Sequence, residues 1–238
     1  MNVQVLASSS AGNCYRVSGG DSSLLLECGI PLKKIREGLD FGLSRVDGCL
    51  LSHSHLDHAK AAADIMLAGV DLYTSKGTAE ALGLTGHRLH LVKPLKWYEM
   101  GPWRVFPFDT VHDTAGSLGF LVDHANGKRL LFATDSAYLK YLFTGVNVLM
   151  LECNYELDAL KDNVQEGIVD RQVKRRILHN HMSLATAKGF LQAMNLSQVT
   201  QIWLLHVSND SGDEARFKSE VQSLTGCPVY VAPEGGRS

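Results

Sequence analysis

Three histidines and one aspartate stand close together in the segment Leu51–His58, in the order His-x-His-x-Asp-His. Imidazole and carboxylate groups are good ligands for transition-metal ions. In an extended segment His53 and His55 point to the same side, so they can share one ion. Asp57 and His58 are adjacent and diverge, which suits a second ion about 3.5–4 Å from the first. The spacing therefore predicts a two-metal site, against the alternative of a polar loop with scattered histidines.

Strand ends are the elements that position these groups. A short apolar strand, predicted over Val46–Leu51, runs directly into the cluster, and a rigid element of this kind can hold ligands in place. His112 follows another predicted strand, although by itself it would more often be an ordinary surface histidine. Asp135 and His206 also follow apolar strands, where a carboxylate can hold two cations at once. The structural alternative for Asp135 is the N-cap of a helix over Ala137–Tyr141.

Another histidine stands beside the start of a helix. His181 precedes a helix predicted near Ser183–Met194, with Ser183 as its N-cap, and free backbone N–H groups at a positive helix end suit a phosphate. His181 is therefore the candidate general acid or phosphate contact, and His179 competes for that role. A basic run stands just upstream: Arg171, Lys174, Arg175 and Arg176. Such runs are commonly solvated faces, but beside a metal site they are candidates to contact a phosphate backbone.

Other histidines and small polar residues carry weaker signals. We interpret His87, His90 and His124 as structural or surface residues. The polar loop that follows the first strand could line the site through three residues, Ser9, Ser10 and Asn13.

Composition limits the class of protein. The 238 residues are 45% hydrophobic and 20% charged, as in an ordinary globular protein, and the formal net charge of -2 provides no global attraction for nucleic acid or membranes. Five widely spaced cysteines without a C-x-x-C pair favour reduced, mostly buried thiols. The chain starts without a basic, apolar leader, and no apolar run approaches about 18 residues. We expect a cytoplasmic protein that does not enter membranes, and no oligomeric state is predicted.

Hydrophobic patterning predicts two runs of strands interleaved with helices, which favours sheet packed on sheet with helices outside, in one domain over 1–238. Predicted strands are Asn2–Ala7, Cys14–Ser18, Ser23–Glu27, Val46–Leu51, Asp71–Tyr73, His90–Val92, Trp103–Phe108, Leu118–Asp123, Arg129–Ala133, Val146–Leu151, Ile202–Leu205 and Val229–Val231. Predicted helices are Pro31–Leu39, Ala59–Ala68, Thr78–Leu82, Ser183–Met194 and Asp213–Leu224. The segment Lys161–Arg176 is the most polar part of the chain.

The His cluster with His112, Asp135 and His206 resembles the metallo-β-lactamase superfamily. A closer resemblance, to the YycJ (WalJ) branch, rests on short motifs along nearly the whole chain. These are LASSSAGNCY (6–15), VHD (111–113), GF (119–120), TDS (134–136), LECNYE (151–156), HMS (181–183) and LHVSN (205–209). That branch contains metal-dependent DNA exonucleases and uncharacterised hydrolases, and it is related to RNase Z and the β-CASP nucleases.

The resemblance implies an α/β fold, a four-layer αβ/βα sandwich with its metal site at the edge between the two sheets. It also implies two divalent ions, zinc or manganese with iron as an alternative. One ion would be bound by His53, His55 and His112. The other would be bound by Asp57, His58 and His206, and Asp135 would bridge the two.

Two departures from the family pattern matter. Glu27 stands where the superfamily usually has Asp, and we expect it to keep a role in supporting the ligands. No large insertion separates Asp135 from His206, which argues against a β-CASP nuclease.

Two such ions would convert water to hydroxide as the nucleophile, with Asp57 orienting it and His181 protonating the leaving oxygen. The leading hypothesis is a metal-dependent phosphodiester hydrolase, a DNA exonuclease by resemblance. RNA processing and cleavage of a cyclic nucleotide or other small phosphodiester are the nearest alternatives. A carboxyl-ester, thioester or lactone hydrolase is favoured less. A flavo-diiron oxidoreductase lacks support because His55 is not a carboxylate, and a non-catalytic module has no chemical reason to retain seven ligands.

Overall fold

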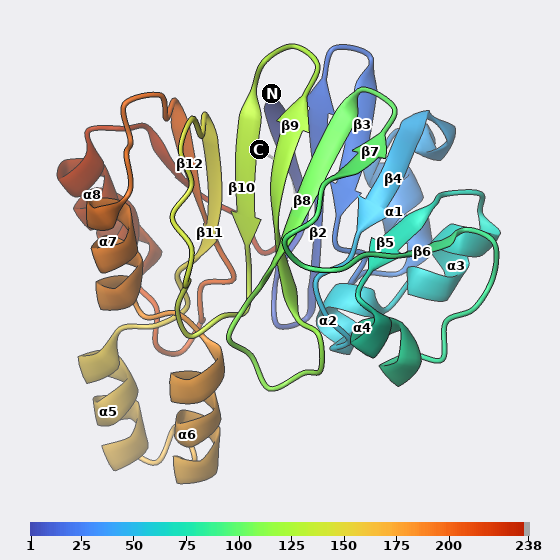
Figure 1. The fold of residues 1–238 in the computed structure, drawn as a ribbon. Helices are drawn as coiled ribbons and strands as arrows, with labels where there is room; N and C mark the ends of the chain where they lie inside the picture. The colour runs from blue at the N-terminus through green and yellow to red at the C-terminus, as the bar shows by residue number, and fades with distance from the viewer. Residues whose placement is uncertain (236–238) are drawn as a thin grey trace. The chain divides into compact units, whose positions relative to one another are not determined.

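The N-terminal strands alternate apolar and polar residues and open a sheet of six strands, in a computed structural model that describes residues 1–235 (Figure 1). The strand order is β1-β2-β3-β4-β5-β6. The bounds are β1 Asn2–Ser9, β2 Gly12–Gly19, β3 Ser22–Leu26, β4 Val46–Leu50, β5 Leu72–Thr74 and β6 Leu89–Leu91. β1, β2 and β3 pair antiparallel, whereas β3, β4, β5 and β6 pair parallel. β4 therefore lies inside the sheet, and the His cluster begins where β4 ends.

The second sheet has seven strands in the order β13-β12-β11-β10-β9-β8-β7. Their bounds are β7 Tyr98–Met100, β8 Trp103–Asp109, β9 Leu118–His124, β10 Arg129–Ala133, β11 Val148–Glu152, β12 Gln201–Leu205 and β13 Val229–Val231. β7, β8 and β9 pair antiparallel, whereas β11, β12 and β13 pair parallel. Every residue of β11 is buried, as the continuous apolar run predicts for a strand covered on both faces.

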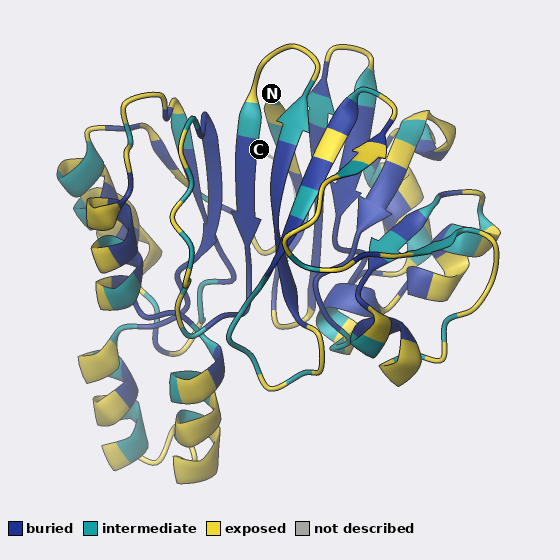
Figure 2. Ribbon diagram, viewed as in Figure 1, coloured by how far each residue is buried: buried dark blue, intermediate teal, exposed yellow. Residues whose placement is uncertain are grey.

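The helices are mostly short. They are α1 Leu32–Gly38, α2 Leu56–Ala59, α3 Ala62–Leu67, α4 Lys76–Ala81, α5 Leu157–Gln165, α6 Arg171–Asn180, α7 Leu184–Ala193 and α8 Glu214–Thr225, with a 3₁₀ turn at Leu43–Arg45. α5 and α6 form a pair whose outward faces are exposed (Figure 2). None of the helices in residues 1–235 is long and apolar enough to span a membrane.

The described chain divides into two compact units. Unit 1 contains 1–109, 114–130 and 232–235, and unit 2 contains 110–113 and 131–231. Within unit 1, the indole N–H of Trp103 on β8 donates to Asp47 on β4 at 3.0 Å, which joins a strand of the second sheet to one of the first. Two sheets and flanking helices confirm the predicted α/β class. The single domain over 1–238 stays a prediction.

Several elements differ from the sequence-based prediction. The helix predicted over Ala59–Ala68 is interrupted, because the backbone N–H of Ala61 donates to Cys28 (2.9 Å) and the chain then restarts as α3. The strand β7 was not predicted, being only three residues long. Two helices, α5 and α6, occupy most of the polar stretch, since a few residues such as Leu160 and Ile177 form their apolar contact.

All five cysteines are buried free thiols. Burial raises the pKa of the Cys14 and Cys153 thiols above the ordinary thiol value, and a hydrogen bond with Cys28 together with burial raises the pKa of Cys49. Little reactive thiolate therefore exists at neutral pH. We expect an aromatic disulfide reagent to react very slowly with the native protein. In guanidinium, which unfolds the chain, the same reagent should react with all five thiols. A native thiol that reacts as fast as free cysteine would contradict this packing.

Candidate functional site

Unit 1 supplies the His cluster. β4 leads through Leu51 and Ser52 to His53, and α2 begins directly after His55. His53 and His58 are fully buried, whereas His55 and Asp57 are partly exposed. A buried imidazole needs a polar partner or a metal ion. The short turn between strand and helix therefore brings the predicted ligands of this unit to one place.

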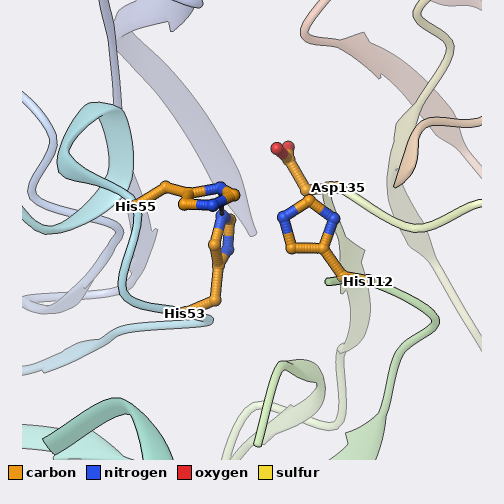
Figure 3. Close-up of side chains that lie close together, drawn as sticks. All are labelled: His53, His55, His112 and Asp135. Carbon is orange, nitrogen blue, oxygen red and sulfur yellow. Dashed lines mark hydrogen bonds between the residues drawn. The ribbon is translucent and has the colours of Figure 1, made fainter. Parts of the chain in front are cut away.

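The ligand atoms of the cluster lie at coordinating separations. His53 Nε2 lies 3.2 Å from His55 Nδ1, and the two rings meet edge to face (Figure 3). Two nitrogens that are each about 2.1 Å from one zinc ion at a tetrahedral angle are about 3.4 Å apart. His58 Nε2 lies 3.3 Å from Asp57 Oδ2, and its ring centroid is 4.2 Å from that of His53. The four side chains predicted from sequence spacing therefore lie close together, and their assignment to two ions stays a prediction.

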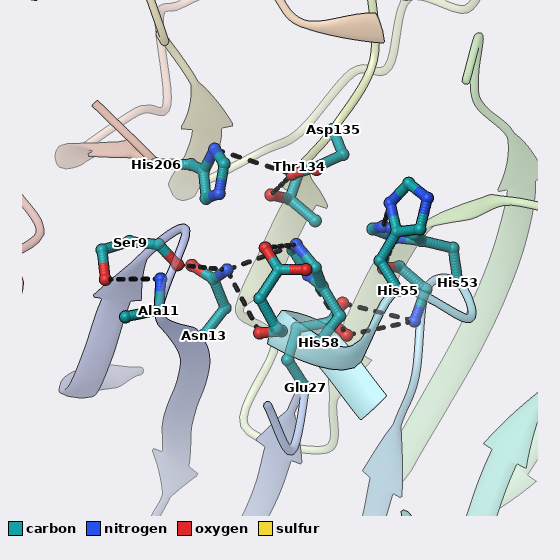
Figure 4. A network of polar contacts seen from close by, with 12 residues as sticks. Ser9, Ala11, Asn13, Glu27, His53, His55, His58, Thr134, Asp135 and His206 are labelled. Carbon is teal, nitrogen blue, oxygen red and sulfur yellow. Dashed lines mark hydrogen bonds and ion pairs between the residues drawn. The ribbon is translucent and has the colours of Figure 1, made fainter. Parts of the chain in front are cut away.

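Three polar side chains surround these histidines in unit 1 (Figure 4). Ser52 Oγ lies 2.8 Å from His53 Nδ1, and Asn13 Nδ2 lies 3.2 Å from His58 Nε2. Buried Glu27 accepts the backbone N–H of Ser52 at 3.2 Å, and its Oε2 lies 3.7 Å from His58 Nδ1. Burial raises the pKa of Glu27, and the adjacent His58 and Ser52 oppose this shift. Contacts of this kind fix ring orientation, which is the supporting role expected of Glu27.

Gly29 is required for the backbone of Asp57 to approach. A Cβ at Gly29 would lie 1.7 Å from the carbonyl oxygen of Asp57, a backbone atom that cannot move alone. We expect Gly29→Ala to lower the free energy of unfolding by about 1–3 kcal/mol or more and to weaken metal binding. Chemical denaturation and metal titration measure the two effects. Gly189→Ala is the matched control, because nothing lies near its added Cβ. Wild-type stability in Gly29→Ala would contradict this packing.

Unit 2 supplies a second group at the ends of β10, β11 and β12. Asp135 follows β10, Glu152 ends β11, and His206 follows β12. Asp135 and His206 have positive φ angles of 36° and 53°, which non-glycine residues seldom adopt. Such backbone persists only where the surroundings enforce it, and it is frequent at functional sites. The segment after Asp135 is not helical, so the N-cap alternative for Asp135 is wrong.

Four side chains of unit 2 could hold an ion. One ligand atom from each of Asp135, Glu152, His181 and His206 lies within 4.8 Å of the others. His181 Nδ1 lies 2.6 Å from Glu152 Oε1 and 3.8 Å from Asp135 Oδ2. The His181 and His206 rings stack at 5.3 Å. Asp135 itself accepts a hydrogen bond from Thr134 Oγ1 at 2.8 Å (Figure 4).

Glu152 was not predicted as a site residue. It is fully buried and accepts the backbone N–H groups of Ser136 (2.8 Å) and Met182 (3.1 Å) in addition to contacting His181. Through these hydrogen bonds the carboxylate links two separate segments, one directly after Asp135 and one directly before α7. The available signal was a charged residue at the end of a continuous apolar run, the same placement as Asp135 and His206.

His112 lies in the short segment of unit 2 that packs on the end of α6. Its Nδ1 lies 3.2 Å from the carbonyl oxygen of Asn180, and Asn180 Nδ2 donates to Asp113 Oδ2 at 2.6 Å. The rings of His112 and His181 are 6.0 Å apart between centroids. A ligand histidine is commonly oriented by such a carbonyl contact.

The structure separates the remaining candidates. His179 is exposed, whereas the side chain of His181 is only 16% exposed and contacts Glu152. His90 stacks on Tyr73, and His124 packs against Trp103, as expected of structural residues. In the polar loop, Asn13 contacts the cluster but Ser10 is exposed.

The donor chemistry of both groups suits divalent ions. Imidazole nitrogens and carboxylate oxygens accept zinc, manganese and iron, and the donor set does not select one of them. The cluster of histidine and aspartate in this fold therefore implies divalent metal ions.

Comparison with known proteins assigns the chain to a family. The chain matches the model of the beta-lactamase superfamily domain over residues 31–207. It is 24% identical over 226 residues to the exodeoxyribonuclease WalJ of Streptococcus pneumoniae (strain D39), an alignment that covers 87% of this chain and 81% of the relative.

Solved structures show the same fold. The metallo-beta-lactamase fold protein YhfI from Bacillus subtilis aligns with a TM-score of 0.74 at 19% identity, covering 98% of this chain and 96% of that chain. The short form of human tRNase Z aligns with a TM-score of 0.67 at 14% identity, covering 100% and 99%. At such identities the likeness shows the fold alone.

Proposed function

Because this chain belongs to the beta-lactamase superfamily, we propose that it is a metal-dependent phosphodiester hydrolase, and specifically a DNA exonuclease. The observation that carries this proposal is the contact of His181 with buried Glu152, next to Asp135 in unit 2. A histidine held in this way can keep a proton on its far nitrogen for a leaving oxygen. The similarity to an exodeoxyribonuclease supports the choice of DNA.

We propose that both units contribute to one pair of metal ions. His53, His55 and His112 would hold the first ion, Asp57, His58 and His206 the second, and Asp135 both. Two adjacent divalent ions activate water near neutral pH and neutralise charge on a phosphate. The predicted single domain follows from this proposal, since neither unit alone has all seven ligands.

The protein's own residues would complete the reaction. Asp57 is partly exposed and lies beside His58, where it can orient the attacking water. His181 would give its Nε2 proton to the leaving oxygen, and Glu152 would hold Nδ1 and stabilise the charged ring. The backbone N–H bonds to Glu152 fix this carboxylate, so little rearrangement is needed during the reaction.

RNA and small phosphodiesters are the alternative substrates. The formal net charge of -2 provides no global attraction for a long polyanion, which keeps a small substrate such as a cyclic nucleotide as an alternative. Carboxyl esters, thioesters and lactones are less favoured, because His181 beside a helix start and the basic residues of α6 suit a phosphate. The predicted cytoplasmic location stays a prediction.

To test this proposal, the purified chain is loaded with manganese or zinc and incubated with each candidate substrate. The substrates are end-labelled single-stranded DNA, duplex DNA, RNA and cyclic nucleotides. We expect stepwise loss of nucleotides from DNA, and no loss with His53→Ala. Hydrolysis of cyclic nucleotides or carboxyl esters alone would contradict the exonuclease, and equal activity in His53→Ala would contradict metal dependence.

A further inference from the structure

Helix α6 is an unusually cationic element. Its ten residues include Arg171, Lys174, Arg175 and Arg176 and no acidic residue, whereas the acidic side chains of this region lie on α5 and the connecting loop. Arg171, Arg175 and His179 recur every four residues, so they follow one another along one face. All three are exposed. Arg171, Arg175 and His179 therefore form a basic stripe along one face of α6.

In the part of the chain that the structure describes, three of the four Lys and Arg side chains of α6 have no acidic partner. Within residues 1–235, the side chains of Arg171, Lys174 and Arg175 form no ion pair, whereas Arg176 lies 3.8 Å from Asp113. The one arginine of unit 2 outside α6, Arg216, forms ion pairs with Glu156 and Glu220. Unpaired cations aligned on a helix attract a chain of negative charges.

The helix is fixed relative to His181. Ile177 and Leu178 pack against a small core that contains Leu160 and Val169, and Asn180 at the end of α6 is tied to Asp113. His181 is the residue that caps the helix. At 1.5 Å per residue, Arg175 is about 9 Å and Arg171 about 15 Å from His181 along the helix axis. Figure 1 shows α6 extending away from β11 and β12 beside α5.

We propose that the exposed face of α6, with Arg171 and Arg175, binds backbone phosphates of a nucleic-acid strand beyond the phosphate being cleaved. This inference rests on the proposed function and names its substrate class, a strand of several nucleotides. A cyclic nucleotide has one phosphate and cannot reach both His181 and this stripe. The modest net charge of the whole chain is compatible with such a substrate because the unpaired cations are concentrated on one helix.

The test compares the wild-type chain with the double variant Arg171→Gln/Arg175→Gln on a thymidine dinucleotide, tetranucleotide and octanucleotide. For the wild type, kcat/KM is expected to rise with length. The double variant should lose most of that gain, about tenfold on the octanucleotide, and should cleave the dinucleotide at the wild-type rate. The slope of log kcat/KM on the octanucleotide against log salt concentration should be less steep for the double variant by about 1.4, because two phosphate contacts are lost.

A charge-matched control is Lys128→Gln/Lys218→Gln, which removes two exposed cations that are not part of α6. It should leave the length dependence intact. A wild type without length dependence, a double variant that loses the same factor on every substrate, or a control that loses as much would overturn the inference.

Binding separates this inference from the proposed function. Fluorescence anisotropy with a labelled octanucleotide and metal-free protein needs no turnover. Weaker binding by the double variant than by wild type would support the α6 surface even if no phosphodiester were hydrolysed, a result that would overturn the proposed function alone. Equal binding by the two proteins would overturn the α6 surface.

Discussion

Asp135→Ala is expected to lose both bound metal and hydrolysis. In the proposed site this carboxylate contacts both ions, so its removal leaves two cations close together without the charge between them. Loss of a central group of a catalytic site lowers turnover by factors on the order of 10³–10⁶. Metal content after dialysis and kcat/KM on a labelled oligonucleotide measure the two effects.

The control for this change is Asp210→Ala, which removes an exposed carboxylate from the same unit. It should retain metal and activity. The positive φ of Asp135 gives a second check, because alanine tolerates that backbone poorly and a small loss of stability is expected as well. If Asp135→Ala kept both wild-type metal content and wild-type activity, the two-metal proposal would be wrong.

His181→Ala is expected to slow turnover by about 10²–10⁴-fold while leaving metal content unchanged. The reason is its place in unit 2, where Nδ1 is held by Glu152 and the ring stacks on His206. Loss of the proton donor should lower kcat more than it raises KM. Substrates with a good leaving group, such as a nitrophenyl phosphodiester, should be affected much less.

His179→Ala is the matched control, since this exposed histidine is two residues away and should be dispensable for cleavage of a dinucleotide. His181 lies close enough to Asp135 and His206 to be a ligand itself. Loss of metal in His181→Ala would therefore identify His181 as a ligand and contradict its role as an acid.

Much of the fold could be predicted because its strands carry strong patterns. The continuous apolar run that forms β11 and the alternation that forms β1 each indicate one structure. The break between α2 and α3 could not be predicted, because it depends on a hydrogen bond from Ala61 to Cys28, distant in sequence. The α5–α6 pair was missed because its apolar contact is made by few residues within a polar stretch.

The sites within each unit were predictable to different degrees. Local spacing placed His53, His55, Asp57 and His58 together, since a strand end and one short helix determine their positions. Glu152 is marked only by its place at the end of an apolar run, because its partners Ser136, His181 and Met182 come from separate segments. The left-handed backbone of Glu27, Asp135 and His206 could not be read from residue type, because non-glycine residues seldom adopt it.

Anomalous scattering from crystals soaked with manganese would locate the metal ions of the proposed site. Two peaks are expected about 3.5–4 Å apart, one beside His53, His55 and His112, the other beside Asp57, His58 and His206, with Asp135 next to both. A single peak surrounded only by Asp135, Glu152, His181 and His206, or no peak at these histidines, would contradict the proposed site.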